Sequence, residues 1–153
     1  MRKNLPGVTV AVLLTGLVIG TATANDDDHR CNAGLLDGLY VFTASGFSTP
    51  LNAASSPKAI IEVLRFNGDG TVDTPFSTVS MNGKVTTTAP GGSGTYTVMA
   101  LNPPESVCRG TLMFPDAPNP SFNLVIAPKG ERIWLLMTNP PSVFEGHAAR
   151  VSR

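Results

Sequence analysis

The sequence has little charge and no excess of either sign. It carries 11 basic and 11 acidic residues among 153, so its formal net charge at pH 7 is zero. Proteins that bind nucleic acid or an anionic lipid surface usually present a clear surplus of Lys and Arg. The composition therefore gives no electrostatic basis for nucleic acid or a membrane surface as a partner.

A long apolar run is also missing. The longest one covers residues 8–19, whereas a helix that spans a membrane needs about 20 mostly apolar residues. Arg2 and Lys3 precede this run and the small residues 22–24 follow it, which are the three parts of a secretory signal. We predict a signal peptide over 1–24, cleaved after Ala24, and a secreted or periplasmic protein without a stable membrane anchor.

Cysteine is scarce, because the chain contains only Cys31 and Cys108. In an oxidising compartment, two thiols in a small exported domain usually pair, so we predict a disulfide; two buried free thiols are the alternative. Neither cysteine has His or acidic neighbours at the spacing of zinc ligands. No phosphate loop, dinucleotide fingerprint or nucleophile elbow occurs either. The sequence thus predicts neither a metal site nor a cofactor.

Helical periodicity is absent as well, and short runs typical of strands take its place. Apolar, β-branched and aromatic runs alternate with Pro, Gly and Asn-Gly turn signals, of which Asn-Gly-Asp-Gly at 67–70 is the strongest. Only 51–58 could instead hold a short turn of helix. The predicted strands are 39–43, 59–66, 71–81, 84–88, 95–100, 107–114, 121–127, 132–138 and 143–151.

Short connections predict antiparallel neighbours, since a parallel pair needs a crossover of about a dozen residues. Removing residues 1–24 from the 153 leaves 129, the size of one domain. We expect a polar lead-in over 25–35 and an all-β domain over 36–153. A single up-and-down barrel of about eight strands is favoured over a two-sheet sandwich, because closure removes both exposed edges.

Several fragments in this order and spacing resemble a group of small exported bacterial proteins of unknown function. The fragments are Cys31-Asn32, 36–42, 64–70, 94–98, 108–112 and 143–150. The domain of that group is similar to the allene oxide cyclase barrel, which is related in shape to the lipocalins and other calycins. The resemblance implies an eight-stranded antiparallel barrel with an internal cavity, and it places Cys31 and Cys108 where the group pairs its cysteines. It implies no cyclase activity, because no catalytic residue of that enzyme matches a position here.

Strand alternation offers a few candidates for chemistry. In 59–66 one face carries Glu62 and the other Arg65, so one of the two points into the barrel. Glu62 or Glu145 beside His147 would make a general acid–base pair, or would anchor a polar group of a ligand. The alternative is that these charges face solvent or make structural pairs. The further ligand-binding candidates are Arg65, Tyr96, Trp134 and Arg150.

Three functions are compatible with these features. The first is a binding protein that holds a small apolar ligand in the barrel, and we favour it because both faces of the strands are apolar. The second is a structural or interaction module with a filled barrel. The third is a cyclase or isomerase that uses the cavity. The sequence makes an enzyme the less favoured class and does not fix an oligomeric state.

Overall fold

The computed structural model describes residues 31–101, 107–115 and 119–153. The predicted signal peptide and residues 25–30 of the predicted lead-in lie outside these ranges. Within them, no helix combines the length and the apolar character that crossing a membrane requires.

Nine strands and two short 3-10 helices make up the described chain. The strands are β1 (Gly38–Ser48), β2 (Ser56–Phe66), β3 (Thr71–Met81), β4 (Lys84–Thr88), β5 (Ser93–Ala100), β6 (Cys108–Met113), β7 (Ser121–Ile126), β8 (Arg132–Met137) and β9 (Ser142–Ser152). The 3-10 helices are η2 (Ala33–Leu36) and η3 (Pro128–Gly130).

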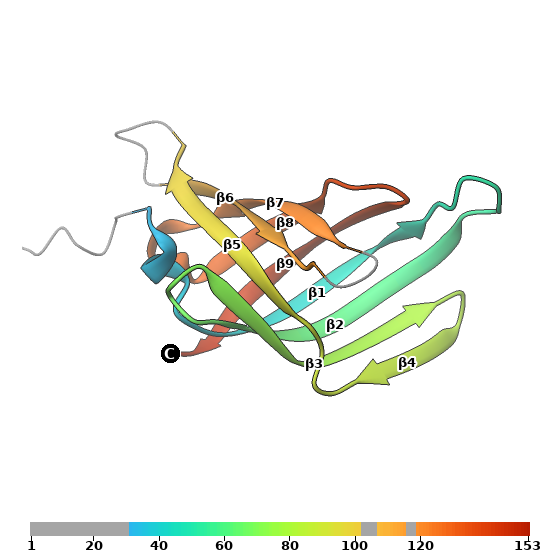
Figure 1. Ribbon diagram of the computed structural model, residues 1–153, viewed down its shortest axis with the longest axis horizontal. Helices are drawn as coiled ribbons and strands as arrows, with labels where there is room; N and C mark the ends of the chain where they lie inside the picture. The colour runs from blue at the N-terminus through green and yellow to red at the C-terminus, as the bar shows by residue number, and fades with distance from the viewer. Residues whose placement is uncertain (1–30, 102–106, 116–118) are drawn as a thin grey trace, which may run out of the picture.

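The strands form one antiparallel sheet that closes on itself. The order is β2-β1-β9-β8-β7-β6-β5-β3-β4, and a further pairing of β2 with β3 joins the two sides. Eight strands therefore form a barrel, and β4 is an extra strand that pairs with the second half of β3 (Figure 1). The predicted all-β barrel is confirmed, and closure decides against the sandwich.

Alternation along each strand separates the core from the surface. In β6 and β7, buried and exposed residues alternate almost without exception. The inner positions supply the core, which consists of Leu36, Tyr40, Phe42, Ala44, Leu64, Phe66, Val72, Tyr96, Cys108, Leu112, Phe122, Leu124, Ile126, Ile133, Leu135, Phe144 and Ala148. The core therefore sits inside the barrel, as expected for strands with one solvated face.

One end of the barrel is closed by η2, drawn in blue beside the C-terminus in Figure 1. Leu36 of this helix is fully buried, and the Cys31–Cys108 disulfide fastens the segment to β6. The predicted disulfide is thus confirmed. The lead-in expected over 25–35 differs from Cys31 onward: its last residues cover the barrel end, because Leu36 and the disulfide draw them against the core.

Aromatic rings fill the half of the barrel next to η2. Tyr40 and Tyr96 flank Phe66 in edge-to-face contacts, with ring centroids 5.1 and 4.9 Å apart. The Tyr96 hydroxyl donates to the Ala33 carbonyl at 2.9 Å. This half therefore has its interior occupied by side chains, as is usual for an eight-stranded barrel.

Arg150 links the strands at the closed end of the barrel to η2, which covers that end. Its Nε donates to the Tyr40 hydroxyl at 2.8 Å, its Nη2 donates to the Leu35 carbonyl, and the Tyr40 hydroxyl donates to the Gly130 carbonyl at 2.6 Å. Burial raises the pKa of Tyr40, and Arg150 opposes part of that rise. The guanidinium therefore has a structural role here, linking β9, β1, η2 and η3.

Arg150→Met is expected to destabilise the protein by about 2 kcal/mol, because it removes two part-buried, charge-assisted hydrogen bonds and leaves the Leu35 carbonyl without this donor. Urea unfolding followed by circular dichroism measures this change. Arg132→Met is the matched control, since Arg132 is exposed on β8. Equal midpoints for the two variants would contradict the structural role of Arg150.

Candidate functional site

Strand β3 changes its hydrogen-bonded neighbour at Thr74 and Pro75. Strand β3 pairs with β5 only over Thr71–Asp73, and its later residues pair with β4 instead. Pro75 has no N–H to donate, and the register with β2 shifts at this point, so that two residues of β3, Thr74 and Pro75, lie opposite Leu64. Strand β3 therefore leaves β5 after Asp73 and continues between β2 and β4.

A cavity of about 360 Å³ lies toward the end of the barrel opposite η2, which we call the open end. Its lining comes from β1, β2, β3, β4, the turn after β4, and the ends of β6 to β9. The lining residues are Phe42, Lys58, Ile60, Glu62, Thr74, Ser77, Val79, Thr88, Gly91, Gly92, Phe114, Pro120, Phe122, Met137, Asn139, Pro140, Pro141 and Ser142. Apolar and aromatic side chains are the larger share, and polar groups come from the β2–β3 wall and from Thr88, Asn139 and Ser142.

Glu62 is the acidic residue of this lining. It lies on the inner face of β2, opposite Phe42 of β1 and Ser77 of β3. Burial raises the pKa of its carboxyl from 4.5 to about 7, and the nearby hydroxyls of Ser77 and Thr74 and the charge of Lys58 offset only part of that rise. A carboxyl with this pKa exists in both protonation states near neutral pH.

Lys58 is the basic residue of the lining, four residues nearer the open end on the same face of β2. Its ammonium lies over the Phe144 ring, with Nζ 5.3 Å from the centroid. Burial lowers the pKa of Lys58, and the charge of Glu62 offsets part of that shift. No salt bridge joins Lys58 to Glu62. The cation is therefore held by an aromatic face rather than by the carboxylate.

Thr74 is buried beside Glu62 with only 3% of its surface exposed. Its hydroxyl is close enough to favour the ionised carboxyl, yet its oxygen meets hydrogen-bond geometry with no atom of the described chain. Gly91 packs on the Thr74 methyl, and a Cβ at that glycine would lie 2.8 Å from Thr74 Cγ2. The turn after β4 thus seals this side of the cavity because residue 91 has no side chain.

Sequence reasoning identified Glu62 but not its neighbours Lys58, Thr74 and Ser77. Counting pairs back from the 67–70 turn places residue 76 opposite Glu62, whereas the structure places Ser77 there. Pro75 inside a predicted strand was the available signal, since proline in a strand usually marks a bulge. Lys58 could have been predicted from strand alternation, because it lies four residues from Glu62 and therefore on the same face of the strand.

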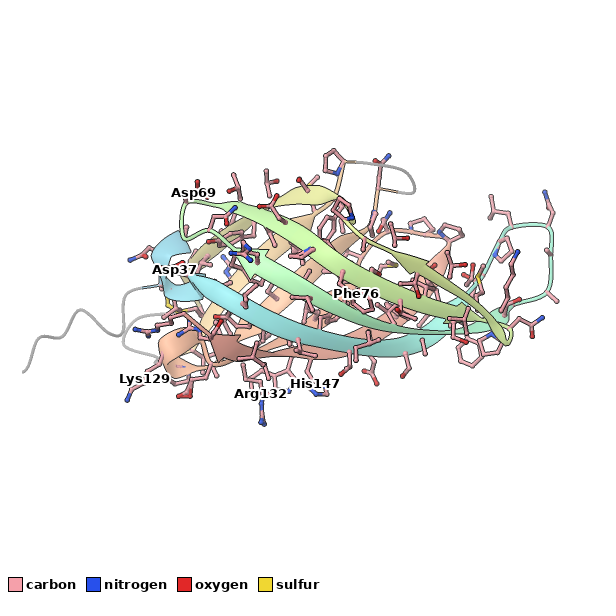
Figure 2. All side chains as sticks on the ribbon, turned by 90° about the horizontal axis from the view of Figure 1, so that it is seen from below. Asp37, Asp69, Phe76, Lys129, Arg132 and His147 are labelled. Carbon is pink, nitrogen blue, oxygen red and sulfur yellow. A yellow bond between two sulfur atoms is a disulfide. The ribbon has the colours of Figure 1, made fainter. Side chains whose placement is uncertain are left out.

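The other acid–base candidates lie outside the barrel. Glu145 and His147 are exposed on the outer face of β9, where His147 is opposite Thr43 and Trp134. Figure 2 shows His147 pointing away from the barrel. Together with Trp134 they border a hollow on the outer surface. The structure therefore brings these three residues together but separates them from Glu62 by the barrel wall.

The remaining ligand-binding candidates lie away from the cavity. Arg65 is exposed on the outer face of β2, opposite Leu39 and Asp73. Tyr96 is buried in the filled half and Arg150 belongs to the hydrogen bonds at the closed end. The question of which charge on β2 points inward is thus answered in favour of Glu62.

The arrangement offers a cavity with an apolar body and one weakly acidic anchor. Of its lining residues, Glu62 and Lys58 are the ionisable ones. Within the described ranges, no group of three His, Cys, Asp or Glu side chains is placed to hold a metal ion. The cavity can therefore bind an apolar molecule and hydrogen-bond or ion-pair with one polar group of it.

The closed antiparallel barrel is consistent with a calycin-like barrel, as the resemblance implied. Comparison of the chain with models of known protein families, with curated proteins and with solved structures finds no match.

Proposed function

We propose that this protein binds a small, mainly apolar molecule in the cavity at the open end of its barrel. The observation that carries the proposal is the contrast between the two halves of the barrel. Side chains fill the half next to η2, whereas the other half keeps about 360 Å³ of space. Ligand sites typically begin at about 300 Å³ and combine apolar walls with a few polar groups.

We also propose that the protein resides in an oxidising compartment, either the periplasm or the extracellular medium. The Cys31–Cys108 disulfide supports this location, because such bonds persist outside the reducing cytoplasm. It also includes the relation to exported bacterial proteins with an allene oxide cyclase-like barrel. The barrel and the position of the disulfide support that relation.

A second candidate function is protein interaction through the outer face of β7, β8 and β9. Val125, Trp134, Leu136 and Val143 are each about half exposed or more on that face, and a hollow lies between this face and β1. Contiguous apolar side chains on a surface often mark a contact with another protein. The cyclase or isomerase alternative has less support, because His147 and Glu145 do not reach Glu62.

Ile60→Trp is expected to weaken binding of the neutral fluorescent dye prodan at least ten-fold. Ile60 lines the cavity, so an indole there takes up much of the space that the dye needs. Fluorescence titration of the dye measures the Kd. Ile61→Trp is the matched control, since Ile61 is 48% exposed on the outer face of the same strand. If prodan binds neither the wild type nor the control, the proposed function fails.

A further inference from the structure

The Glu62 carboxyl lies in an apolar cavity without a cationic partner. No salt bridge reaches it from the described part of the chain. The nearest cation that acts on it, Lys58, instead places its ammonium over the Phe144 ring. A carboxyl that is removed from water and left unpaired destabilises the fold unless something else supplies the charge. The arrangement therefore leaves room for a cation that comes with the ligand.

We propose that the ligand is an organic ammonium, an apolar aromatic molecule with one protonated amine that pairs with Glu62. This rests on the proposed function of the cavity as a binding site, and it names the chemical class of the ligand. The ammonium donates to the Glu62 carboxylate, and the apolar part lies among the residues toward the open end. Three features of the lining carry the proposal.

The first feature is the pair of hydroxyl groups beside the carboxyl. An ammonium has up to three N–H groups to donate. The Ser77 hydroxyl lies beside Glu62 as its cross-strand partner and accepts one of these hydrogens. The buried Thr74 hydroxyl has no other partner, so it is free to turn its proton toward Glu62 when the carboxyl ionises. Thr74 is thus a positioning residue that supports the charged form of Glu62.

The second feature is the aromatic character of the opposite wall. Phe42, Phe114 and Phe122 all line the cavity, and the rings of Phe42 and Phe122 meet edge to face with centroids 6.1 Å apart. Aromatic faces attract cations and pack well against a flat apolar ligand. A carboxylate opposite aromatic rings suits an aromatic amine better than it suits an anion.

The third feature is the pair of ionisable groups in the lining. The strands packed against Glu62 contribute Phe42 from β1 and Thr74 and Ser77 from β3, and none of these residues carries a charge. The other ionisable side chain of the lining is Lys58 on β2. An anionic ligand bound at Glu62 would be repelled by that group when it is ionised. Such a ligand could pair with a cation of the lining only at Lys58, four residues nearer the open end. An alcohol would pair with the carboxyl but would leave its charge uncompensated.

The test uses three ligands that share one scaffold: 2-naphthylmethylamine, 2-naphthylmethanol and 2-naphthoate. Each displaces prodan from the processed protein in a fluorescence competition assay. At pH 8 we expect the amine to bind at least ten-fold more tightly than the alcohol, and naphthoate to bind most weakly. Glu62→Gln should weaken amine binding about thirty-fold, the loss of a charge-assisted hydrogen bond.

The pH dependence of the wild type tests the proposal without any substitution. With a Glu62 pKa of about 7, lowering the pH from 8 to 5.5 protonates the anchor and should weaken amine binding about thirty-fold. Binding of the alcohol should change little. Thr74→Val should move the midpoint of the amine profile to higher pH, whereas Thr78→Val, on the outer face of the same strand, should not.

The outcomes separate the two proposals. If the alcohol or naphthoate binds as well as the amine, or if Glu62→Gln leaves amine binding unchanged, the ammonium proposal is wrong and the cavity remains a ligand site. If prodan binds but none of the naphthalenes does, the ammonium proposal is likewise wrong. If neither prodan nor any naphthalene binds, the proposed function itself fails.

Discussion

Replacing Cys31 and Cys108 with alanine is expected to lower the free energy of unfolding by about 4 kcal/mol. The bond joins residues 77 apart in sequence, and the chain-entropy model assigns about 4 kcal/mol to a loop of that length. The loss has a structural part too, since the disulfide holds the segment that places Leu36 over the closed end of the core. Urea unfolding of the processed double variant measures the effect.

Reduction of the wild type with dithiothreitol is the matched experiment. The chain holds no other cysteine, so the reagent acts on this bond alone. Prodan binding should survive in reduced protein that is still folded, because the cavity lies at the opposite end of the barrel. An unchanged urea midpoint would contradict the expected contribution of the disulfide to stability.

Glu62→Gln is expected to stabilise the protein at pH 8 by up to about 3 kcal/mol relative to the wild type. A carboxyl whose pKa rises from 4.5 to about 7 on folding destabilises the native state by about that much once it is ionised in both states. Glutamine has nearly the same shape but never ionises. Urea unfolding at a series of pH values measures the difference between the two proteins.

The sign of this pH dependence follows from proton uptake. Below about pH 4.5, Glu62 is protonated in the folded and unfolded chains and contributes no pH dependence. Between 4.5 and about 7 the folded protein retains a proton that the unfolded chain has released, so raising the pH favours unfolding. Above about pH 7, Glu62 is ionised in both states and its full destabilisation of the folded protein remains. The advantage of Glu62→Gln should therefore grow from pH 4.5 to 7 and then level off.

Other carboxyls titrate in a different range and cancel in this comparison. Hydrogen bonds lower the pKa of Asp69, mainly from Thr71, and that of Asp73, mainly from Asn67. The stability that they contribute is lost only as the pH falls through their lowered values, in both proteins alike. Glu145→Gln, an exposed carboxyl on the outer face, should show no such gain. A constant difference from pH 4.5 to 8 would contradict the buried position of Glu62.

These two predictions and the ammonium proposal concern opposite ends of one barrel. The disulfide end is filled and stabilised by covalent and hydrogen-bonded links to η2. The open end keeps space and an unpaired carboxyl that reduces stability. Binding sites often carry such unfavourable groups, because a ligand relieves the destabilisation when it binds. A ligand that pairs with Glu62 should therefore also raise the thermal midpoint of the protein.

The amino-acid sequence by itself determined the strands, their antiparallel direction and the disulfide. It also determined most neighbours, except that β5 pairs with β3 rather than with β4. Turn residues such as Asn67-Gly68 fix local backbone geometry, and alternation of apolar residues fixes which side chains share a face. Both signals are short-range, so they can be read without knowing the rest of the chain. The nine predicted strands were predictable for that reason. The pairing of Cys31 with Cys108 was predictable because an exported chain with two cysteines offers one possible bond.

Only the tertiary structure decided which face is inside and where the barrel stays open. Alternation shows which residues share a face of a strand, but not which face points into the barrel. Both faces of β2 are mainly apolar, so Glu62 and Arg65 were equal candidates. Closure of the barrel places Glu62 on the inside. The bulge at Pro75 then set Ser77 and Thr74 beside it. Closure depends on contacts between strands far apart in sequence, and no local pattern encodes it. Pro75 signals a bulge, but the residues that the bulge sets beside Glu62 follow only from the pairing of β3 with β2.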